Sequence, residues 1–178
     1  MSGAEHTPRD DSLPRLTHID EHGNAHMVDV TGKDVTRRVA EARCTVVTEA
    51  DVATVLAGRP GGHDLVEMAR SAGVQAAKLT PTLVPLCHPL LIDGTVVDVA
   101  VVVGGVAIRA VTTVAGRTGV EIEALTACAV ASLVLVQAFF DHDPGTSVEG
   151  LAVWHKSGGR TGTWVRGGHA DGGRPLEA

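Results

Sequence analysis

The stretch Ala76-Ala-Lys-Leu-Thr-Pro-Thr-Leu-Val-Pro-Leu-Cys-His-Pro-Leu-Leu-Ile92 joins a helical pattern to a strand pattern. Three of its residues are Pro81, Pro85 and Pro89. Because each proline fixes φ and lacks a backbone donor, we expect the preceding helix to end here. The prediction is a stiff, irregular loop that presents Cys87 and His88. A rigid loop often carries site residues, and histidine changes its charge near neutral pH.

Upstream of this loop the sequence predicts one strand and two helices. Residues 1–15 are polar and without periodicity, which is typical of a disordered tail. Alternation over residues 35–48 predicts a long strand, and a short helix should run from about residue 48 to residue 58. After a glycine-rich loop, Asp64 is a candidate N-cap for a helix whose small and apolar residues recur every three or four positions.

Downstream of the loop, residues 95–103 and 106–114 alternate as two strands joined by a hairpin at Gly104-Gly105. A long helix over residues 120–140 and a last strand over residues 148–154 follow, and frequent glycine makes order doubtful from residue 157 on. This order predicts an α+β fold with a ferredoxin-like antiparallel sheet and helices on one face. We expect a single domain over residues 16–156 and a flexible, glycine-rich tail over residues 157–178.

Composition narrows the classes of function. The chain has 178 residues, a net charge of −6 and only 2% aromatic residues. The negative charge and the few aromatic side chains argue against a nucleic-acid-binding platform and against an anionic membrane surface. The 120–140 helix is apolar almost all round, which indicates burial on more than one side and suggests a subunit interface.

Cysteine usage and the N-terminus favour a cytoplasmic protein. The three cysteines are far apart in the sequence and form no CxxC pair, so reduced thiols are expected. The first 15 residues do not resemble a signal peptide, and we see no apolar run near the roughly 18 residues that span a membrane. No metal is expected, because the cysteine and histidine residues lack the spacing of a ligand set.

Four blocks of sequence carry a resemblance to a known family. They are Val84-Pro-Leu-Cys-His-Pro-Leu90, Leu16-Thr-His-Ile-Asp20 with Ala25-His-Met-Val-Asp-Val30, Thr118-Gly-Val-Glu-Ile-Glu-Ala-Leu-Thr-Ala127 and Lys156-Ser-Gly-Gly-Arg-Thr-Gly162. In order and spacing they resemble the cyclic pyranopterin monophosphate synthase (MoaC) family of molybdenum cofactor biosynthesis. The resemblance implies the same α+β fold, assembled as a hexamer of dimers with sites at the dimer interface, and implies no cofactor.

The resemblance also implies roles for four residues that would otherwise have ordinary explanations. An isolated histidine is most often structural, an exposed aspartate usually bonds a turn, and carboxylates near a helix start are favoured by the helix dipole. Glu121 and Glu123 share a face only if the chain is extended there, because on a helix they diverge by roughly 200°. Through the resemblance, the expected catalytic residues are Asp29, His88, Glu121 and Glu123.

Several cations are candidates to hold phosphate. Arginine and lysine in a glycine-rich loop such as residues 156–162 can wrap an anion, although this loop is not a P-loop. Without the resemblance, a mobile surface loop would explain the same pattern. The expected substrate- or phosphate-binding residues are Arg37, Arg38, Lys78, Cys87, Lys156 and Arg160.

Three positions depart from the family pattern. Gly62 stands where the family has a catalytic lysine, and Gln137 and Phe140 stand where the family has an aspartate and a lysine three residues apart. Loss of both members of an ion pair can leave the stability of the fold almost unchanged, but loss of a general acid or base typically lowers the reaction rate by about 10²–10⁴. His63, beside Gly62, is the nearest residue that could compensate.

Two functions follow from these observations. The first is the family reaction, in which 3′,8-cyclo-7,8-dihydro-GTP, a purine-derived nucleotide, becomes cyclic pyranopterin monophosphate and diphosphate. The second is a catalytically impaired or repurposed homologue that binds a nucleotide or pterin, or pairs with a complete paralogue. A small metal-binding domain is a remote third alternative.

Overall fold

The computed structural model describes residues 17–57 and 65–168. Its elements are β1 (Thr36–Val47), α1 (Val52–Ala57), α2 (Leu65–Leu83), β2 (Gly94–Val102), β3 (Gly105–Gly116), α3 (Glu121–Phe139), β4 (Ser147–Ser157), β5 (Trp164–Val165) and a 3-10 turn (Arg166–Gly168). The candidate N-cap Asp64, together with Gly62 and His63, lies outside the described residues.

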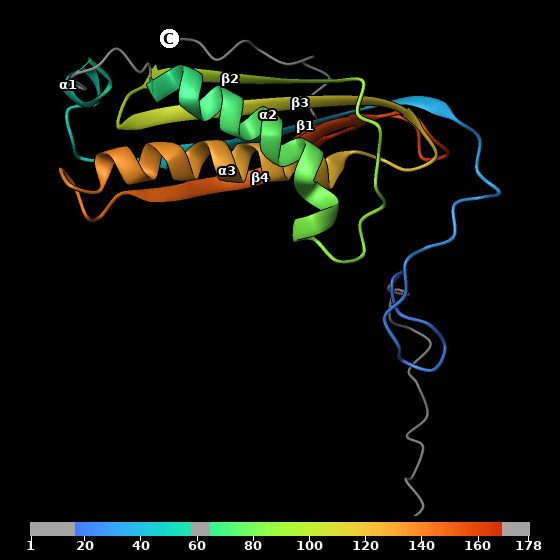
Figure 1. The fold of residues 1–178 in the computed structure, drawn as a ribbon. Coiled ribbons are helices and arrows are strands. Elements are labelled where there is room, and N and C mark those ends of the chain that lie inside the picture. Colours follow the sequence, from blue (N-terminus) through green and yellow to red (C-terminus); the bar gives the residue numbers. More distant parts are fainter. Residues whose placement is uncertain (1–16, 58–64, 169–178) are drawn as a thin grey trace, which may run out of the picture.

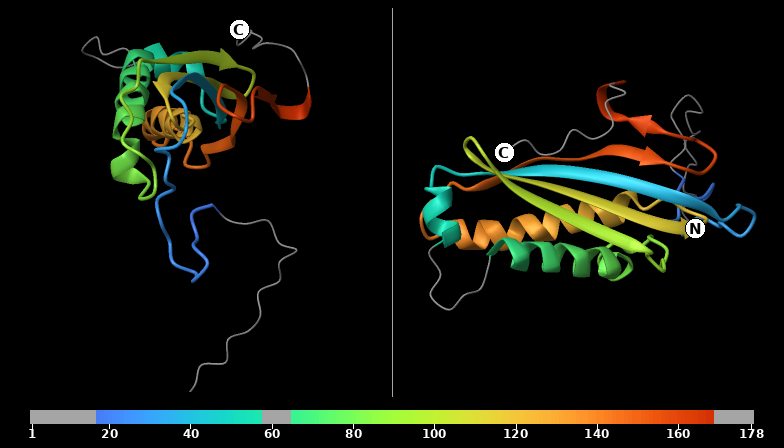
Figure 2. Two further views of the ribbon diagram at one scale, coloured as in Figure 1. Left: turned by 90° about the vertical axis from the view of Figure 1, so that its right-hand side faces the viewer. Right: turned by 90° about the horizontal axis from the view of Figure 1, so that it is seen from above.

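The strands form one antiparallel sheet in the order β2-β3-β1-β4-β5. The helices α2 and α3 lie side by side along the same face of the sheet (Figures 1 and 2). The strand β3 pairs between β1 and β2, as in a split β-α-β unit, and β4 pairs on the other side of β1. The predicted α+β, ferredoxin-like fold is therefore confirmed.

The core lies between the sheet and the two helices α2 and α3, and it is built from small aliphatic side chains. Along β1, Ala40, Ala42, Cys44 and Val46 are buried, as expected for alternate residues that face one side of a sheet. The largest fully buried side chain is Phe139, at the last turn of α3. Because aromatic residues are scarce, the core is filled mainly by closely packed alanine, valine and leucine side chains.

The contact between the two long helices depends on one glycine. A Cβ atom at Gly73 of α2 would lie 2.9 Å from the carbonyl oxygen of Ala127 on α3 and 3.3 Å from the Ala131 side chain. Such a separation is shorter than an ordinary carbon contact, so glycine lets the two helix backbones approach closely.

The helix ends within the proline-containing stretch, as predicted, but it passes Pro81, which was not expected, and continues to Leu83. A proline here removes one backbone hydrogen bond, but only the last turn of the helix depends on it. Two hydroxyl groups bond to backbone carbonyls in the same turn: Thr80 Oγ1 donates to Ala76 at 3.3 Å and Thr82 Oγ1 to Leu79 at 2.6 Å. The irregular loop therefore begins only after Leu83.

Two more boundaries differ from the prediction. The helix α1 begins at Val52, after Asp51, whose carboxylate accepts from the amides of Ala53 and Thr54 at 3.1 and 3.4 Å. The strand β4 continues to Ser157, and the two-residue β5 pairs with it in a stretch where glycine made order doubtful. The hairpin at Gly104 was expected, and its φ of +78° is the left-handed conformation that glycine adopts readily.

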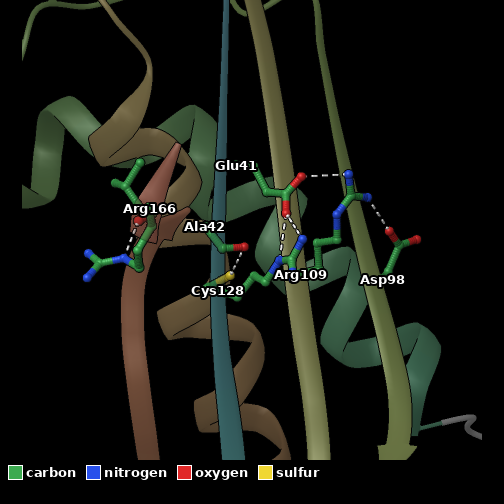
Figure 3. Close-up of polar contacts among 8 residues, drawn as sticks. Glu41, Ala42, Asp98, Arg109, Cys128 and Arg166 are labelled. Atoms are coloured by element: carbon green, nitrogen blue, oxygen red, sulfur yellow. Dashed lines mark hydrogen bonds and ion pairs between the residues drawn. The ribbon is translucent and has the colours of Figure 1, made fainter. Parts of the chain in front are cut away.

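The sheet face away from the helices carries an ion network in place of an apolar layer. Glu41 is 5% exposed and lies between Arg109 and Arg43, and Arg109 also binds Asp98 (Figure 3). Burial opposes ionisation of Glu41, but hydrogen bonds from the two arginines outweigh it and lower the pKa of this carboxyl. Arg43 also lies over the ring of Trp154, at 4.9 Å from its centre.

The helix α3 is long and apolar enough to cross a membrane by length and composition alone. The prediction that no apolar run approaches the length of a membrane span is therefore wrong for this segment. Half of the helix is buried within the protein, where Cys128, Ala131 and Leu135 belong to the core. A core helix passes the same test of length and composition, so the finding is weak evidence for a membrane span.

Candidate active site

A cavity of about 240 Å³ lies at the N-terminal end of α3. Three segments that are distant in the sequence form its wall: the chain before β1, the loop after α2 and the start of α3. The lining residues are Thr17, His18, Val28, Val30, Lys33, Leu86, Cys87, His88, Thr118, Gly119, Glu121, Ile122 and Glu123. The proline-containing loop and the Glu-Ile-Glu segment therefore meet at one site, as the sequence blocks suggested.

His88 connects the loop to the chain before β1. Its Nε2 atom lies 2.9 Å from the carbonyl oxygen of Val28. Because a carbonyl oxygen can only accept, the ring must carry its proton on Nε2 when it is neutral. The other ring nitrogen, Nδ1, is then the one that can accept a proton from a ligand.

Glu121 and Glu123 both line the cavity although they stand on the first turn of a helix. Glu123 is only 3% exposed, and burial raises the pKa of its carboxyl, an effect to which the neighbouring Glu121 carboxylate adds. The pKa of the Cys87 thiol is also raised, chiefly by burial and in addition by the negative charge of Glu123. The site thus contains a carboxyl group that holds its proton more readily than an exposed glutamate does.

Lys156 joins the cavity to the glycine-rich loop. Its Nζ atom lies 3.5 Å from a carboxylate oxygen of Glu121 and donates to Thr161 Oγ1 at 3.1 Å. The strand β5 holds this region, because Trp164 and Val165 pair with Lys156 and His155. Lys156 therefore lies next to the cavity and forms an ion pair with Glu121, one of the two lining glutamates.

The remaining predicted residues do not line the cavity. Asp29 is exposed, and its carboxylate accepts from the Thr31 amide at 2.8 Å, which lowers the pKa of Asp29. The side chain of Arg38 donates from Nε to the Gly116 carbonyl at 2.9 Å. Three further cations are exposed elsewhere, namely Arg37, Lys78 and Arg160. Their roles as substrate ligands stay predictions.

Sequence reasoning missed Lys33, which is among the residues that line the cavity. No local pattern marks it, because it is an isolated lysine in a turn before β1. What places it is a tertiary contact: Arg117 Nε donates to the Lys33 carbonyl at 3.0 Å. Four other residues before β1 line the cavity, namely Thr17, His18, Val28 and Val30. Unlike Lys33, these four lie within the sequence blocks that resemble the family.

Of the three positions that depart from the family pattern, two lie within the described residues. Both are far from the cavity formed by their own chain. Gln137 and Phe140 are exposed at the C-terminal end of α3, and Phe140 is 53% exposed. Gln137 follows Glu121 by sixteen positions along the helix, which corresponds to roughly 24 Å along the axis. One chain therefore does not bring Gln137 to its own cavity. Within residues 17–57 and 65–168, no three metal-ligating side chains gather in one place.

Comparison with known proteins identifies relatives that cover most of the chain. The sequence profile of the MoaC family matches residues 27–159. Cyclic pyranopterin monophosphate synthase of Nocardioides sp. is 49% identical over 161 residues, which cover 88% of this chain and 98% of that protein. The enzyme of the same name from Streptomyces coelicolor is 46% identical over 167 residues, with 93% and 95% covered.

A third relative, cyclic pyranopterin monophosphate synthase 2 of Mycobacterium tuberculosis, is 46% identical over 153 residues, covering 85% of this chain and 91% of that protein. The profile match spans both the loop after α2 and the start of α3, which form the cavity. The chain belongs to the MoaC family.

Proposed function

We propose that this chain acts in molybdenum cofactor biosynthesis and converts 3′,8-cyclo-7,8-dihydro-GTP to cyclic pyranopterin monophosphate with release of diphosphate. The observation that carries the proposal is the cavity in which His88, Glu121 and Glu123 converge. The names of the relatives support the same reaction.

The geometry suits proton transfer around a purine-derived ring. The reaction opens the five-membered ring of the purine, closes a pyran and forms a cyclic phosphate, so protons must be given and taken at several atoms. Glu123, with its raised pKa, can donate a proton, and Nδ1 of His88 can accept one. Lys156, whose Nζ atom lies 3.5 Å from a carboxylate oxygen of Glu121, would face the phosphates of the substrate.

The site of the family reaction should combine two chains. Because Gln137 and Phe140 lie at the end of α3 away from the cavity, a partner chain is needed to bring this end to it. This supports the expected homo-oligomer, a hexamer of dimers with sites at the dimer interface. We also place the protein in the cytoplasm, where its thiols, which form no disulfide among the described residues, would stay reduced.

The test is turnover by two single variants, Glu121→Gln and His88→Ala. Each should lower diphosphate release by about 10²–10⁴, because each removes a group positioned for proton transfer. Circular dichroism and thermal melting should show a folded protein. Glu149→Gln, an exposed carboxylate at the start of β4, is the matched control and should keep the activity of the unaltered chain. Unchanged turnover in the two site variants would remove the proposed site.

A second candidate function rests on Gln137 and Phe140, which supply neither the carboxylate nor the cation that the family carries at these positions. A chain without them, and with Gly62 in place of a lysine, could bind a nucleotide or pterin without converting it. It could also pair with a complete paralogue. This alternative predicts measurable ligand binding without diphosphate release by the purified chain.

A further inference from the structure

Gly119 lies between β3 and α3 and lines the cavity, next to Glu121, the first residue of α3. The side chain of Glu121 turns back over this glycine. A Cβ atom added to Gly119 would lie 2.6 Å from Cδ of Glu121 and 2.8 Å from one carboxylate oxygen, and it would overlap the other oxygen. Carbon atoms that are not bonded stay about 3.5 Å or more apart, so the Glu121 carboxylate lies in space that any side chain at Gly119 would fill.

The usual reasons for a glycine do not explain this one. Gly119 is not among the described glycines with a positive φ, so its backbone conformation is open to other residues. The three heavy atoms nearest to the added Cβ atom all belong to Glu121. At Gly73, by contrast, the nearest atom is the backbone oxygen of Ala127 on the neighbouring helix. Helix packing therefore explains Gly73, whereas the carboxylate of Glu121 explains Gly119.

The space over Gly119 keeps Glu121 beside Lys156. The carboxylate lies 3.5 Å from Nζ of Lys156, and the two side chains are 29% and 31% exposed. Water weakens the attraction of an ion pair that is this exposed, so the charges alone do not fix its geometry. Lys156 is held on its other side, because Nζ also donates to Thr161 Oγ1 at 3.1 Å. A displaced Glu121 carboxylate would therefore leave Lys156 behind.

The position of Glu121 also bears on the second acid of the cavity. The pKa of Glu123 is raised chiefly by burial, and the negative charge of Glu121 adds to this effect. Moving one carboxylate thus changes the surroundings of the other. The arrangement of both acids depends on the space that Gly119 leaves open.

We propose that Gly119 is a positioning residue for Glu121: because it has no side chain, the Glu121 carboxylate can lie over the backbone at the cavity wall and within reach of Lys156. The inference rests on the proposed function in taking Glu121 as a group that acts in the reaction. Gly119 itself takes no part in proton transfer.

The first experiment is structural and needs no turnover. Crystal structures of the unaltered chain and of Gly119→Ala should show the distance between Lys156 Nζ and the Glu121 carboxylate rising from 3.5 Å to more than about 4 Å, the limit of an ion pair. The matched control is Gly94→Ala at the start of β2. Nothing in the described part of the chain lies within 4 Å of a Cβ atom there, so the pair should stay intact.

The second experiment measures diphosphate release from 3′,8-cyclo-7,8-dihydro-GTP. Gly119→Ala should lower kcat and kcat/KM together by about tenfold to a hundredfold, because misplacement of a reacting group by about 1 Å can cost about 10² in rate. Gly94→Ala should keep the unaltered rate. In a chain that already carries Glu121→Ala, adding Gly119→Ala should cost less than about twofold, because no carboxylate is left to displace.

Four results would overturn the inference. The first is an ion pair that stays within about 4 Å in Gly119→Ala, and the second is an unchanged kcat although the pair is broken. The third is an equal loss of rate with and without Glu121→Ala, which would mean that Gly119 acts through another group. The fourth is failure of both Gly119→Ala and the double variant to fold, which would show that the backbone itself requires glycine.

One result separates the inference from the proposed function. If the unaltered chain shows no turnover but Gly119→Ala breaks the ion pair between Glu121 and Lys156, Gly119 still positions Glu121. In that case only the proposed reaction fails.

Discussion

The two ends of α3 belong to one continuous helix but differ in the chemistry that they offer. At the N-terminal end, Glu121 and Glu123 face a cavity together with His88. At the C-terminal end, Phe139 fills the core while Gln137 and Phe140 are exposed and uncharged. The comparison teaches that the residues that hold this helix in place are separate from those expected to carry the reaction, so one set can change while the other is retained.

The largest expected effect is on stability, and it compares two adjacent residues at the C-terminal end of α3. Phe139→Ala should lower the free energy of unfolding by about 3–5 kcal/mol, because Phe139 is fully buried. Phe140→Ala should change it by less than about 1 kcal/mol, because Phe140 is 53% exposed. Urea unfolding of both variants measures the difference. Equal losses would mean that Phe140 is buried in solution, for example by a partner chain.

A smaller effect tests the chemical half. Combining Gln137→Asp with Phe140→Lys should restore an acid–base pair three residues apart on one helix face. We expect diphosphate release to rise about tenfold, less than a positioned acid–base group can give, because Gly62 is unchanged. The control is Leu133→Lys, which adds a charge to the same helix at a side chain that is 60% exposed. An equal rise in the control, or no rise in the double variant, would show that these positions do not contribute to the site.

The smallest effect concerns the acid at the other end of α3. Because the folded pKa of Glu123 lies above its ordinary value of 4.5, its stabilising effect is complete below that pH and is lost as the pH rises through the folded pKa. Glu123→Gln should therefore stabilise the protein at pH 8, where the carboxyl would otherwise be ionised, and have little effect near pH 4.5. Thermal melting across this range measures the difference, with Glu149→Gln as control. Lower stability of the variant at pH 8 would mean that the buried carboxylate makes a favourable contact.

The fold could be predicted largely from local pattern. Alternation in β1 and in the β2–β3 hairpin follows from side chains that point to opposite faces of a sheet, and the structure confirms both. Two errors have physical causes. Pro81 sits in the last turn of α2, where the lost hydrogen bond costs little, and β5 is held by pairing with β4 in spite of its glycine-rich surroundings.

The site could be predicted only in part. Cys87, His88, Glu121 and Glu123 stand in sequence blocks with a clear resemblance, and the structure brings them to one cavity. Lys33 could not be found in this way, because an isolated lysine in a turn has no periodicity or spacing. Only the tertiary hydrogen bond from Arg117 shows that its turn belongs to the wall of the cavity.

The most direct test of the account is diphosphate release and pterin formation from 3′,8-cyclo-7,8-dihydro-GTP by the purified chain alone. The account predicts turnover that falls by about 10²–10⁴ in Glu121→Gln, because the cavity at the N-terminal end of α3 carries the proton-transfer groups. Binding of the nucleotide without any diphosphate release would contradict it, and would show that the uncharged end of α3 has turned this member of the MoaC family into a binding protein.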